Sequence, residues 1–351
     1  MSELVRSQIG SIGVVLVNYN GWQDTHECLE SLSRCRGALH SVVVVDNASS
    51  ENRIDEFRIN HPDVHWIRSE TNTGWSGGNN IGIKHFLDPK NATDAIFLLN
   101  NDTVVDPRIF EYMQEAFDQG YDLIGPVIND YQQRHEIQTQ GVAFNLKNKP
   151  MEFFTEIPTP INEKNLEVSV VDIINGCAVA IRRDVFEQIG LIDNRFFLIC
   201  EESDFCLRAK QFGFACGVLH KSLVWHKHSV TFARAGKPLQ RYYSVRNLSL
   251  LLSKHQSVPG RKSWLSSRIA YLRHTYHLYC HEVEMANRPG ALAVTQGLFD
   301  ASLGRFGPRK IGESLGGQSV AFIFESMRMV SSKWALFRKT NSTIDGSNPG
   351  R

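Results

Sequence analysis

The sequence lacks long apolar runs and the cysteine patterns of secreted or zinc-binding proteins. Within its 351 residues we find no stretch of about 18 consecutive apolar residues, the length needed to cross a bilayer as a helix. Its seven cysteines include no Cys-x-x-Cys pair, and their odd number fits neither a zinc ribbon nor a disulfide framework. We therefore expect a globular cytoplasmic protein with reduced thiols and a core large enough to fold without a structural metal.

Two common nucleotide-binding signatures are also missing. The glycine-rich segment 72–82 contains neither Gly-x-Gly-x-x-Gly nor the Lys-Ser/Thr pair of a P-loop. This excludes the usual dinucleotide fingerprint and the usual ATPase cradle. Glycines at this density still let a ligand approach the backbone closely, and amides at the start of the next helix can bind phosphate or sugar hydroxyl groups.

Charge is distributed unevenly along the chain. The net charge is +1, but residues 1–230 contain 20 basic and 31 acidic side chains, whereas residues 231–351 contain 18 and 6. The basic C-terminal third indicates contact with an anionic surface such as phospholipid headgroups; ordinary basic surface helices are the alternative. Because no nucleic-acid recognition motif accompanies this charge, we expect no nucleic-acid partner.

Buried strands and helices alternate in the first hundred residues. Apolar runs at 14–17, 42–45, 64–67 and 95–99 are separated by helical segments, which predicts a mostly parallel α/β sheet covered on both faces. In such sheets ligands bind beyond the carboxyl ends of the strands. Three of the four runs end in Asn or Asp, which indicates a nucleotide site there. From residue 239 onward the pattern becomes helical, with aromatic and basic residues interleaved.

Polar residues at the strand ends are candidates for nucleotide and metal binding. Asp46 can bind a nucleobase or ribose, or it can form an Asx turn. Asp102 can hold a divalent cation together with two phosphates, or Asn100 to Asp102 can cap a helix. His226 follows an apolar segment and can complete a metal site with Asp102; an ordinary surface histidine is the alternative.

Three acidic residues lie within four positions at the start of a predicted helix. Glu201 and Glu202 are adjacent, and their mutual repulsion raises one pKa toward the range of a general base. Glu201, Asp204 and Arg208 fall on one helical face and can pair, which leaves Glu202 pointing elsewhere. The alternative is a solvated helix N-terminus, where acids interact favourably with the helix dipole.

In this order, the motifs resemble those of inverting family 2 glycosyltransferases with the GT-A fold. The resemblance spans about residues 12–247, and segment 242–247 (YYSVRN) places it closest to the rhamnosyltransferase-like branch. Two positions depart from the family pattern. The Asp-x-Asp metal motif begins here with Asn100, and the residue in the base position is Glu202 rather than Asp.

The resemblance implies an architecture and a set of roles. It implies a Rossmann-like, mostly parallel sheet in a catalytic domain at 10–235, with a donor half at about 10–128 and an acceptor half at about 129–235. A basic, aromatic-rich helical extension at 236–340 and a disordered tail at 341–351 would follow. Glu202 would be the base, supported by Glu201 and Asp204, and Mg²⁺ or Mn²⁺ would be held by Asp102 and His226. The donor-binding residues would be Asn18, Asn20, Asp46, Asn72, Gly74, Asn79, Asn100 and Asp102, and the acceptor-side or supporting residues Trp75, Arg208 and Arg246.

The resemblance also implies substrates. The predicted reaction transfers L-rhamnose from dTDP-rhamnose, or a sugar from a UDP-sugar, to a saccharide or polyprenyl-diphosphate-linked acceptor in bacterial surface polysaccharide synthesis. The C-terminal helices would bind the inner face of the cell membrane, or else pack on the catalytic domain or form a homodimer. A sugar nucleotidyltransferase would need a glycine-rich signature with Arg and Lys after the first strand, which residues 18–21 do not provide. A non-catalytic nucleotide-sugar-binding homologue is the other alternative.

Overall fold

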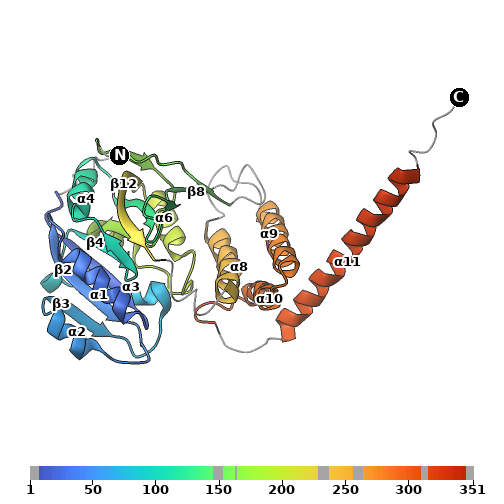
Figure 1. Cartoon of the computed structure of the whole chain (residues 1–351), viewed down its shortest axis with the longest axis horizontal. Coiled ribbons are helices and arrows are strands. Elements are labelled where there is room, and N and C mark those ends of the chain that lie inside the picture. The colour runs from blue at the N-terminus through green and yellow to red at the C-terminus, as the bar shows by residue number, and fades with distance from the viewer. Residues whose placement is uncertain are drawn as a thin grey trace.

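The computed structural model describes residues 8–144, 153–162, 164–227, 237–255, 264–309 and 315–344. A sheet-containing part is followed by helices that lie beside it, and the last helix projects away from the rest (Figure 1). The expectation of an α/β fold with a C-terminal helical extension is confirmed.

The N-terminal half of the sheet is parallel. Strand β1 pairs in parallel with β2 on one side and with β4 on the other, and β3 follows β2 at the edge. All four strands therefore end at the same edge of the sheet, as predicted. Their bounds are β1 (Ile12–Asn18), β2 (Leu39–Asp46), β3 (Val64–Arg68) and β4 (Ala95–Asn100).

The second half of the sheet is mixed. Strand β11 (Ala178–Arg182) runs antiparallel between β4 and β6, and β6 pairs in parallel with β12, so the long sheet has the order β10-β12-β6-β11-β4-β1-β2-β3. The strand β5 pairs with β12, β7 pairs with β6, and β8 and β9 form a separate pair. The remaining bounds are β5 (Thr103–Val105), β6 (Leu123–Asp130), β7 (Ile137–Thr139), β8 (Val142–Phe144), β9 (Phe154–Glu156), β10 (Val168–Val170) and β12 (Cys216–His226).

Helices cover both faces of the sheet, which explains why its strands are continuously apolar. Val14 and Leu16 of β1 pack in one core with residues of α1 and α4, whereas Val15 between them packs in a second core with residues of α3, α5 and α6. This alternation follows from the two-residue period of a strand. The helices are α1 (Trp22–Leu32), α2 (Ile54–Asn60), α3 (Gly74–Leu87), η1 (Pro89–Asn91), α4 (Ile109–Asp118), α5 (Arg183–Ile189) and α6 (Glu201–Gln211).

The C-terminal helices share a core with the sheet domain. They are α8 (Lys237–Lys254), α9 (Trp264–Glu284), α10 (Arg288–Ser302) and α11 (Leu315–Ile344). Val245 and Leu251 of α8 belong to the same apolar cluster as Phe205 of α6. Among the described residues, no helix is long and apolar enough to cross a membrane. Helix α11 includes the first residues of the predicted tail, and residues 345–351 lie outside the described part.

Candidate functional site

A cavity of about 660 Å³ lies at the carboxyl ends of β1 and β4. The loops after β1 and β2, the loop before α3 and the start of that helix, the turn after β4, the segment before β11 and the start of α6 all contribute to its wall. Most of the predicted site residues line it, although they are far apart in the sequence. These are Asn72, Gly74, Trp75, Asn79, Asn100, Asp102, Glu201, Glu202 and His226.

The glycine-rich loop is held by a side chain that follows β2. The Oδ1 atom of Asn47 accepts a hydrogen bond from the Thr73 amide (3.0 Å), and its Nδ2 atom donates to the carbonyl oxygen of Gly74 (3.0 Å). Asn72 in turn accepts a hydrogen bond from the Gly74 amide (2.9 Å). Gly74 has φ +71°, and an added Cβ would lie 2.2 Å from the carbonyl oxygen of Phe197. Only glycine fits this position.

The indole of Trp75 connects the glycine-rich loop to the end of β4. Its Nε1 donates to Oδ1 of Asn100 (3.0 Å), while its carbonyl accepts from Asn79 (2.9 Å). A Cβ added to Gly176 would be 3.2 Å from both the Trp75 ring and Cβ of Glu202. Trp75 and Glu202 therefore flank Gly176 in the cavity wall, so the loop beside the donor strands and the acidic helix meet there.

The predicted metal ligands are next to each other. Oδ1 of Asp102 lies 3.1 Å from Nε2 of His226, and both residues line the cavity. Nδ1 of His226 is 2.7 Å from Oε1 of Gln138. Because a carbonyl oxygen can only accept, Nδ1 carries the proton, and in a neutral imidazole the lone pair of Nε2 faces the carboxylate. A cation between these two atoms would satisfy both lone pairs.

Three of the predicted donor-binding residues do not line the cavity. Asn18 and Asp46 are fully buried and bonded to each other (3.1 Å), and the second carboxylate oxygen of Asp46 contacts the guanidinium of Arg68. Asn20, with φ +56°, accepts hydrogen bonds from the amide and the hydroxyl of Ser50. These residues support the loops after β1 and β2 in this structure, and their contact with a nucleotide stays a prediction.

The two adjacent glutamates begin α6 inside the cavity wall. Burial raises the pKa of Glu202. Burial and, next, the negative charge of Glu202 raise the pKa of Glu201 well above its usual range. Glu201 is 5% exposed, and its Oε2 atom has no hydrogen-bond partner among the described residues. Such a pair is costly to fold and is typical of acid–base sites.

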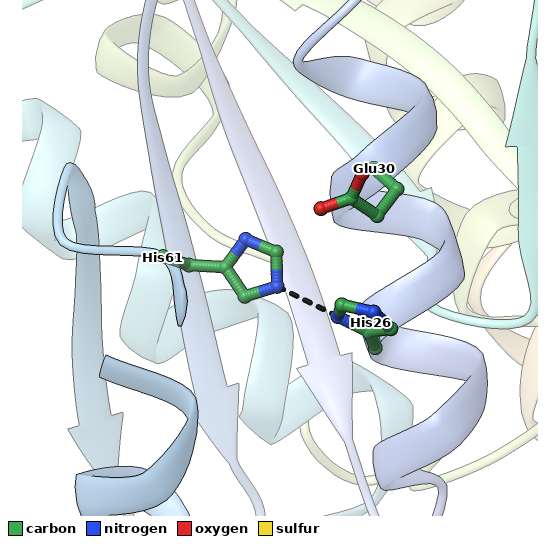
Figure 2. Close-up of side chains that lie close together, drawn as sticks. All are labelled: His26, Glu30 and His61. Carbon is green, nitrogen blue, oxygen red and sulfur yellow. Dashed lines mark hydrogen bonds between the residues drawn. The ribbon is translucent and has the colours of Figure 1, made fainter. Parts of the chain in front are cut away.

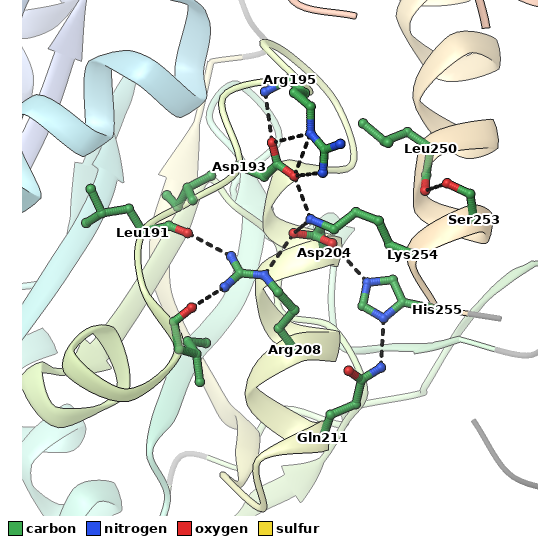
Figure 3. A network of polar contacts seen from close by, with 12 residues as sticks. Leu191, Asp193, Arg195, Asp204, Arg208, Gln211, Leu250, Ser253, Lys254 and His255 are labelled. Atoms are coloured by element: carbon green, nitrogen blue, oxygen red, sulfur yellow. Dashed lines mark hydrogen bonds and ion pairs between the residues drawn. The ribbon is translucent and has the colours of Figure 1, made fainter. Parts of the chain in front are cut away.

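Asp204, the third acid of this segment, has an environment opposite to that of Glu201 and Glu202. Asp204 lies one helical turn beyond Glu201 and is fully buried outside the cavity, bonded to Arg208 (3.0 Å), Lys254 (2.8 Å) and His255 (2.9 Å). Burial opposes ionisation, but these bonds prevail and the pKa of Asp204 is lowered. Figure 3 shows this network joining α6 to the end of α8. Asp204 and Arg208 pair as predicted, but Glu201 does not join them.

Arg246, predicted on the acceptor side, is also outside the cavity lining. Its side chain is 1% exposed and bonds to backbone carbonyl oxygens, including that of Phe196 (2.9 Å).

Several cavity residues were missed by sequence reasoning. Asn47 follows Asp46 directly, so its strand-end position was a usable signal. Asn101, within the predicted turn, donates to Thr25 (2.9 Å). Gln138 and Gln240 also line the cavity, but no sequence pattern distinguishes them from other polar residues.

A group of three potential metal ligands lies elsewhere. Among the described residues, His26, Glu30 and His61 place one ligand atom each within 4.8 Å of one another. None of the three lines the cavity. They lie between α1 and the end of α2, with the two imidazoles facing each other (Figure 2).

The fold and the cavity define a GT-A type sugar transferase, and the comparisons with known proteins agree. A family model described as "Glycosyltransferase like family 2" matches residues 10–244. The chain therefore belongs to glycosyltransferase family 2.

The relatives are moderately similar. The chain is 30% identical over 250 residues to the low-salt glycan biosynthesis hexosyltransferase Agl10 of Haloferax volcanii, covering 69% of this chain and 75% of the relative. It is 28% identical over 221 residues to the dTDP-rhamnosyl transferase RfbF of Shigella flexneri, covering 61% and 71%. A crystal structure of GalNAc-T7 with UDP, GalNAc and Mn²⁺ superposes with a TM-score of 0.52 at 14% identity, covering 80% of this chain and 59% of that one, and supports the fold alone.

Proposed function

We propose that this transferase inverts the anomeric centre, using Glu202 as the base and a nucleotide diphospho-sugar as the donor. The observation that carries the proposal is the cavity itself. Its lining includes the glycine-rich loop, the Asp102–His226 pair and Glu202, whose pKa is raised. A base and a site for a charged leaving group thus share one space.

The reaction is a single displacement. Glu202 accepts the proton of the acceptor hydroxyl, whose oxygen bonds to the anomeric carbon while the bond to the nucleotide diphosphate breaks. The raised pKa makes the ionised form of Glu202 a stronger base than an exposed carboxylate. Ser203 donates to Oε1 of Glu202 (3.3 Å) and fixes its orientation.

The residues present fit Mg²⁺ or Mn²⁺. Asp102 offers a hard oxygen ligand and His226 an imidazole nitrogen, and the two atoms face each other at 3.1 Å. Donor phosphates and water would complete the coordination. When bound, the cation would neutralise the charge of the leaving diphosphate.

For the donor we propose dTDP-rhamnose, with UDP-sugars as the alternative. The name of the Shigella relative, a dTDP-rhamnosyl transferase, supports dTDP-rhamnose as the donor. The UDP in the GalNAc-T7 structure supports the alternative of a UDP-sugar. We propose a saccharide or polyprenyl-diphosphate-linked acceptor in surface polysaccharide synthesis. A thermal-shift panel of both donors with Mg²⁺ and Mn²⁺ tests the assignment, because only the true donor should raise the melting temperature markedly.

We also propose that the C-terminal helices contact an anionic membrane surface. Apolar side chains are exposed on α9 and α11, among them Leu265 and Phe322, in the basic third of the chain. This combination suits the headgroup region. Co-sedimentation with anionic vesicles should weaken in a Leu265→Ser/Phe322→Ser variant and be unchanged in Ile59→Ser, whose exposed side chain lies in α2.

The decisive experiment is Glu202→Gln. Transfer should fall about 10²–10⁴-fold because the amide cannot accept the proton, while donor affinity stays within about twofold. Glu187→Gln on α5, an exposed position paired with Arg183, is the matched control and should keep full activity. Equal turnover in the wild type and Glu202→Gln would remove Glu202 from the role.

A further inference from the structure

The backbone immediately before Glu201 is held in an unusual conformation. We call residues 196–200 the base loop because they lead directly into α6. Phe197, Ile199 and Cys200 have φ values of +66°, +71° and +71°. Side chains with a Cβ rarely adopt this region, and a β-branched residue such as Ile199 does so only when surrounding contacts impose it. Something outside the loop must therefore stabilise it.

The stabilising contacts come from two neighbouring residues in the middle of α8. Nδ2 of Asn247 lies within hydrogen-bond distance of three carbonyl oxygens of the base loop, those of Phe196 (2.9 Å), Leu198 (2.6 Å) and Ile199 (2.7 Å). Nη2 of Arg246 donates to the carbonyl oxygens of Phe196 (2.9 Å) and Arg195 (3.3 Å). Asn247 is fully buried and Arg246 is 1% exposed. These donors replace the water that a strained loop would otherwise need.

Aromatic rings surround the guanidinium of Arg246. The Arg246 guanidinium lies 4.6 Å from the ring centre of Tyr243 and 5.3 Å from that of Tyr242. The ring of Phe197, within the base loop, stacks on Tyr243 at 5.5 Å. The guanidinium is therefore positioned by cation–π contacts as well as by hydrogen bonds.

The end of the same helix holds the chain beyond the glutamates. Lys254 and His255 bind Asp204, two residues after Glu202 (Figure 3). Glu202 thus lies between two attachments to the α8 segment, one to the backbone before it and one to the side chain after it. Leu198 and Ile199 of the base loop also line the cavity.

We propose that Arg246 and Asn247 are positioning residues that set the geometry of the base loop and, through it, of Glu202. This inference rests on the proposed function, and it makes α8 a working part of the active site.

The test is substitution of Asn247 by Leu and by Asp, which keep its approximate size but remove the amide donors. We expect kcat to fall at least tenfold, with KM for the donor changed less than threefold, since misplacing a catalytic group can reduce rates by about 10²-fold. Amide hydrogen exchange in residues 196–203 should accelerate. Arg246→Lys keeps the positive charge and a single nitrogen that can donate hydrogen bonds. It should therefore retain more activity than Arg246→Met.

A matched control separates positioning from general stability. Arg241→Gln/Glu282→Gln removes an ion pair (2.5 Å) between α8 and α9 without touching the base loop. It should lower the melting temperature but leave kcat and exchange in residues 196–203 unchanged. If amide hydrogen exchange in residues 196–203 kept its wild-type rate in both Asn247 variants, the inference would be overturned. If the wild type transfers no sugar from any donor, the proposed function fails, while hydrogen exchange still decides whether α8 holds the loop.

A second observation independently carries a metal site. Nδ1 of His26 and Nε2 of His61 are 2.9 Å apart, and Glu30 extends toward them from one turn further along α1 (Figure 2). Nitrogen ligands on one tetrahedral Zn²⁺ would be about 3.3 Å apart, so the rings need to separate by only a few tenths of an ångström.

We propose that His26, Glu30 and His61 bind a transition-metal dication such as Zn²⁺, which would link α1 to α2. In calorimetry of metal-free, tag-free protein with ZnCl₂, His61→Asn and His26→Asn should each abolish one Zn²⁺ site. Asp102→Asn/His226→Asn should retain it, because that pair belongs to the cavity. Unchanged stoichiometry in both histidine variants, or no Zn²⁺ binding by the wild type, would overturn the proposal.

Discussion

Within one turn of α6 the chain contains carboxyl groups in two opposite environments. Glu201 is buried and Glu202 is half-buried at the cavity, and both have raised pKa values. Oε2 of Glu201 has no hydrogen-bond partner among the described residues. Asp204 is equally buried but binds three cationic or imidazole groups, and its pKa is lowered. The sequence alone shows three acids at a helix start. Asp204 therefore anchors the helix, whereas Glu201 and Glu202 line the cavity.

The largest expected effect on stability comes from removing the anchor. Asp204→Asn should lower the free energy of unfolding by about 3–5 kcal/mol, because it leaves Lys254, Arg208 and His255 without their shared anion. Urea denaturation at pH 7 measures this. Asp55→Asn, whose partner Arg58 is exposed on α2, is the control and should change stability by less than about 0.5 kcal/mol. Equal effects in the two variants would show that the network contributes nothing.

Removing Glu201 should leave the titration of its neighbour where it is. The charge of Glu202 is one of the causes that raise the pKa of Glu201 well above its usual range, so Glu201 is still protonated when Glu202 ionises. In Glu201→Gln the acid limb of the pH profile of kcat/KM should therefore keep its wild-type position. Profiles between pH 4.5 and 8 measure this. An acid limb that moved to lower pH in Glu201→Gln would mean that Glu201 carries a charge while Glu202 titrates.

The smallest expected effect is on the stability of Glu201→Gln, and its sign is opposite to that of Asp204→Asn. The folded-state pKa of Glu201 is above the ordinary value of 4.5, so its contribution to stability is present below pH 4.5 and lost as pH rises through the folded pKa. Glu201→Gln should therefore be neutral or stabilising by up to about 1 kcal/mol at pH 7, with no gain at pH 4.

Asp204 should behave in the opposite way with pH. Its folded-state pKa lies below the ordinary value of 3.8, so its contribution is present above pH 3.8 and lost as pH falls through the folded pKa. The destabilisation by Asp204→Asn should therefore be equal at pH 7 and pH 4 and should shrink only below pH 3.8. Urea titrations of both variants at pH 7, pH 4 and pH 3 compare the two. A stabilisation of Glu201→Gln that persisted at pH 4 would contradict this account.

The sequence was sufficient for the strand-end half of the site. Parallel strands covered on both faces are continuously apolar, so polar residues after each run are candidates for the ligand edge. Asn100 and Asp102 line the cavity, whereas Asn18 and Asp46 are buried and do not. It was insufficient where function depends on contacts between distant segments. Nothing near Arg246 indicates that its side chain binds a loop 50 residues earlier, and the left-handed conformation of Ile199 contradicts its local propensity. The environments of Asp204 and Glu201 differ only because α8 packs against one of them.

The shared core of the sheet domain and α8 has a consequence for exchanging parts between related enzymes. A chimaera that joined residues 1–227 to the C-terminal helices of another transferase would replace both attachments around Glu202. The graft would have to supply an amide and a guanidinium facing the base loop and a cation facing Asp204. An exchange of C-terminal helices must therefore keep the residues of α8 in the same positions facing the base loop and Asp204. Point substitutions on α9 and α11 leave those positions unchanged.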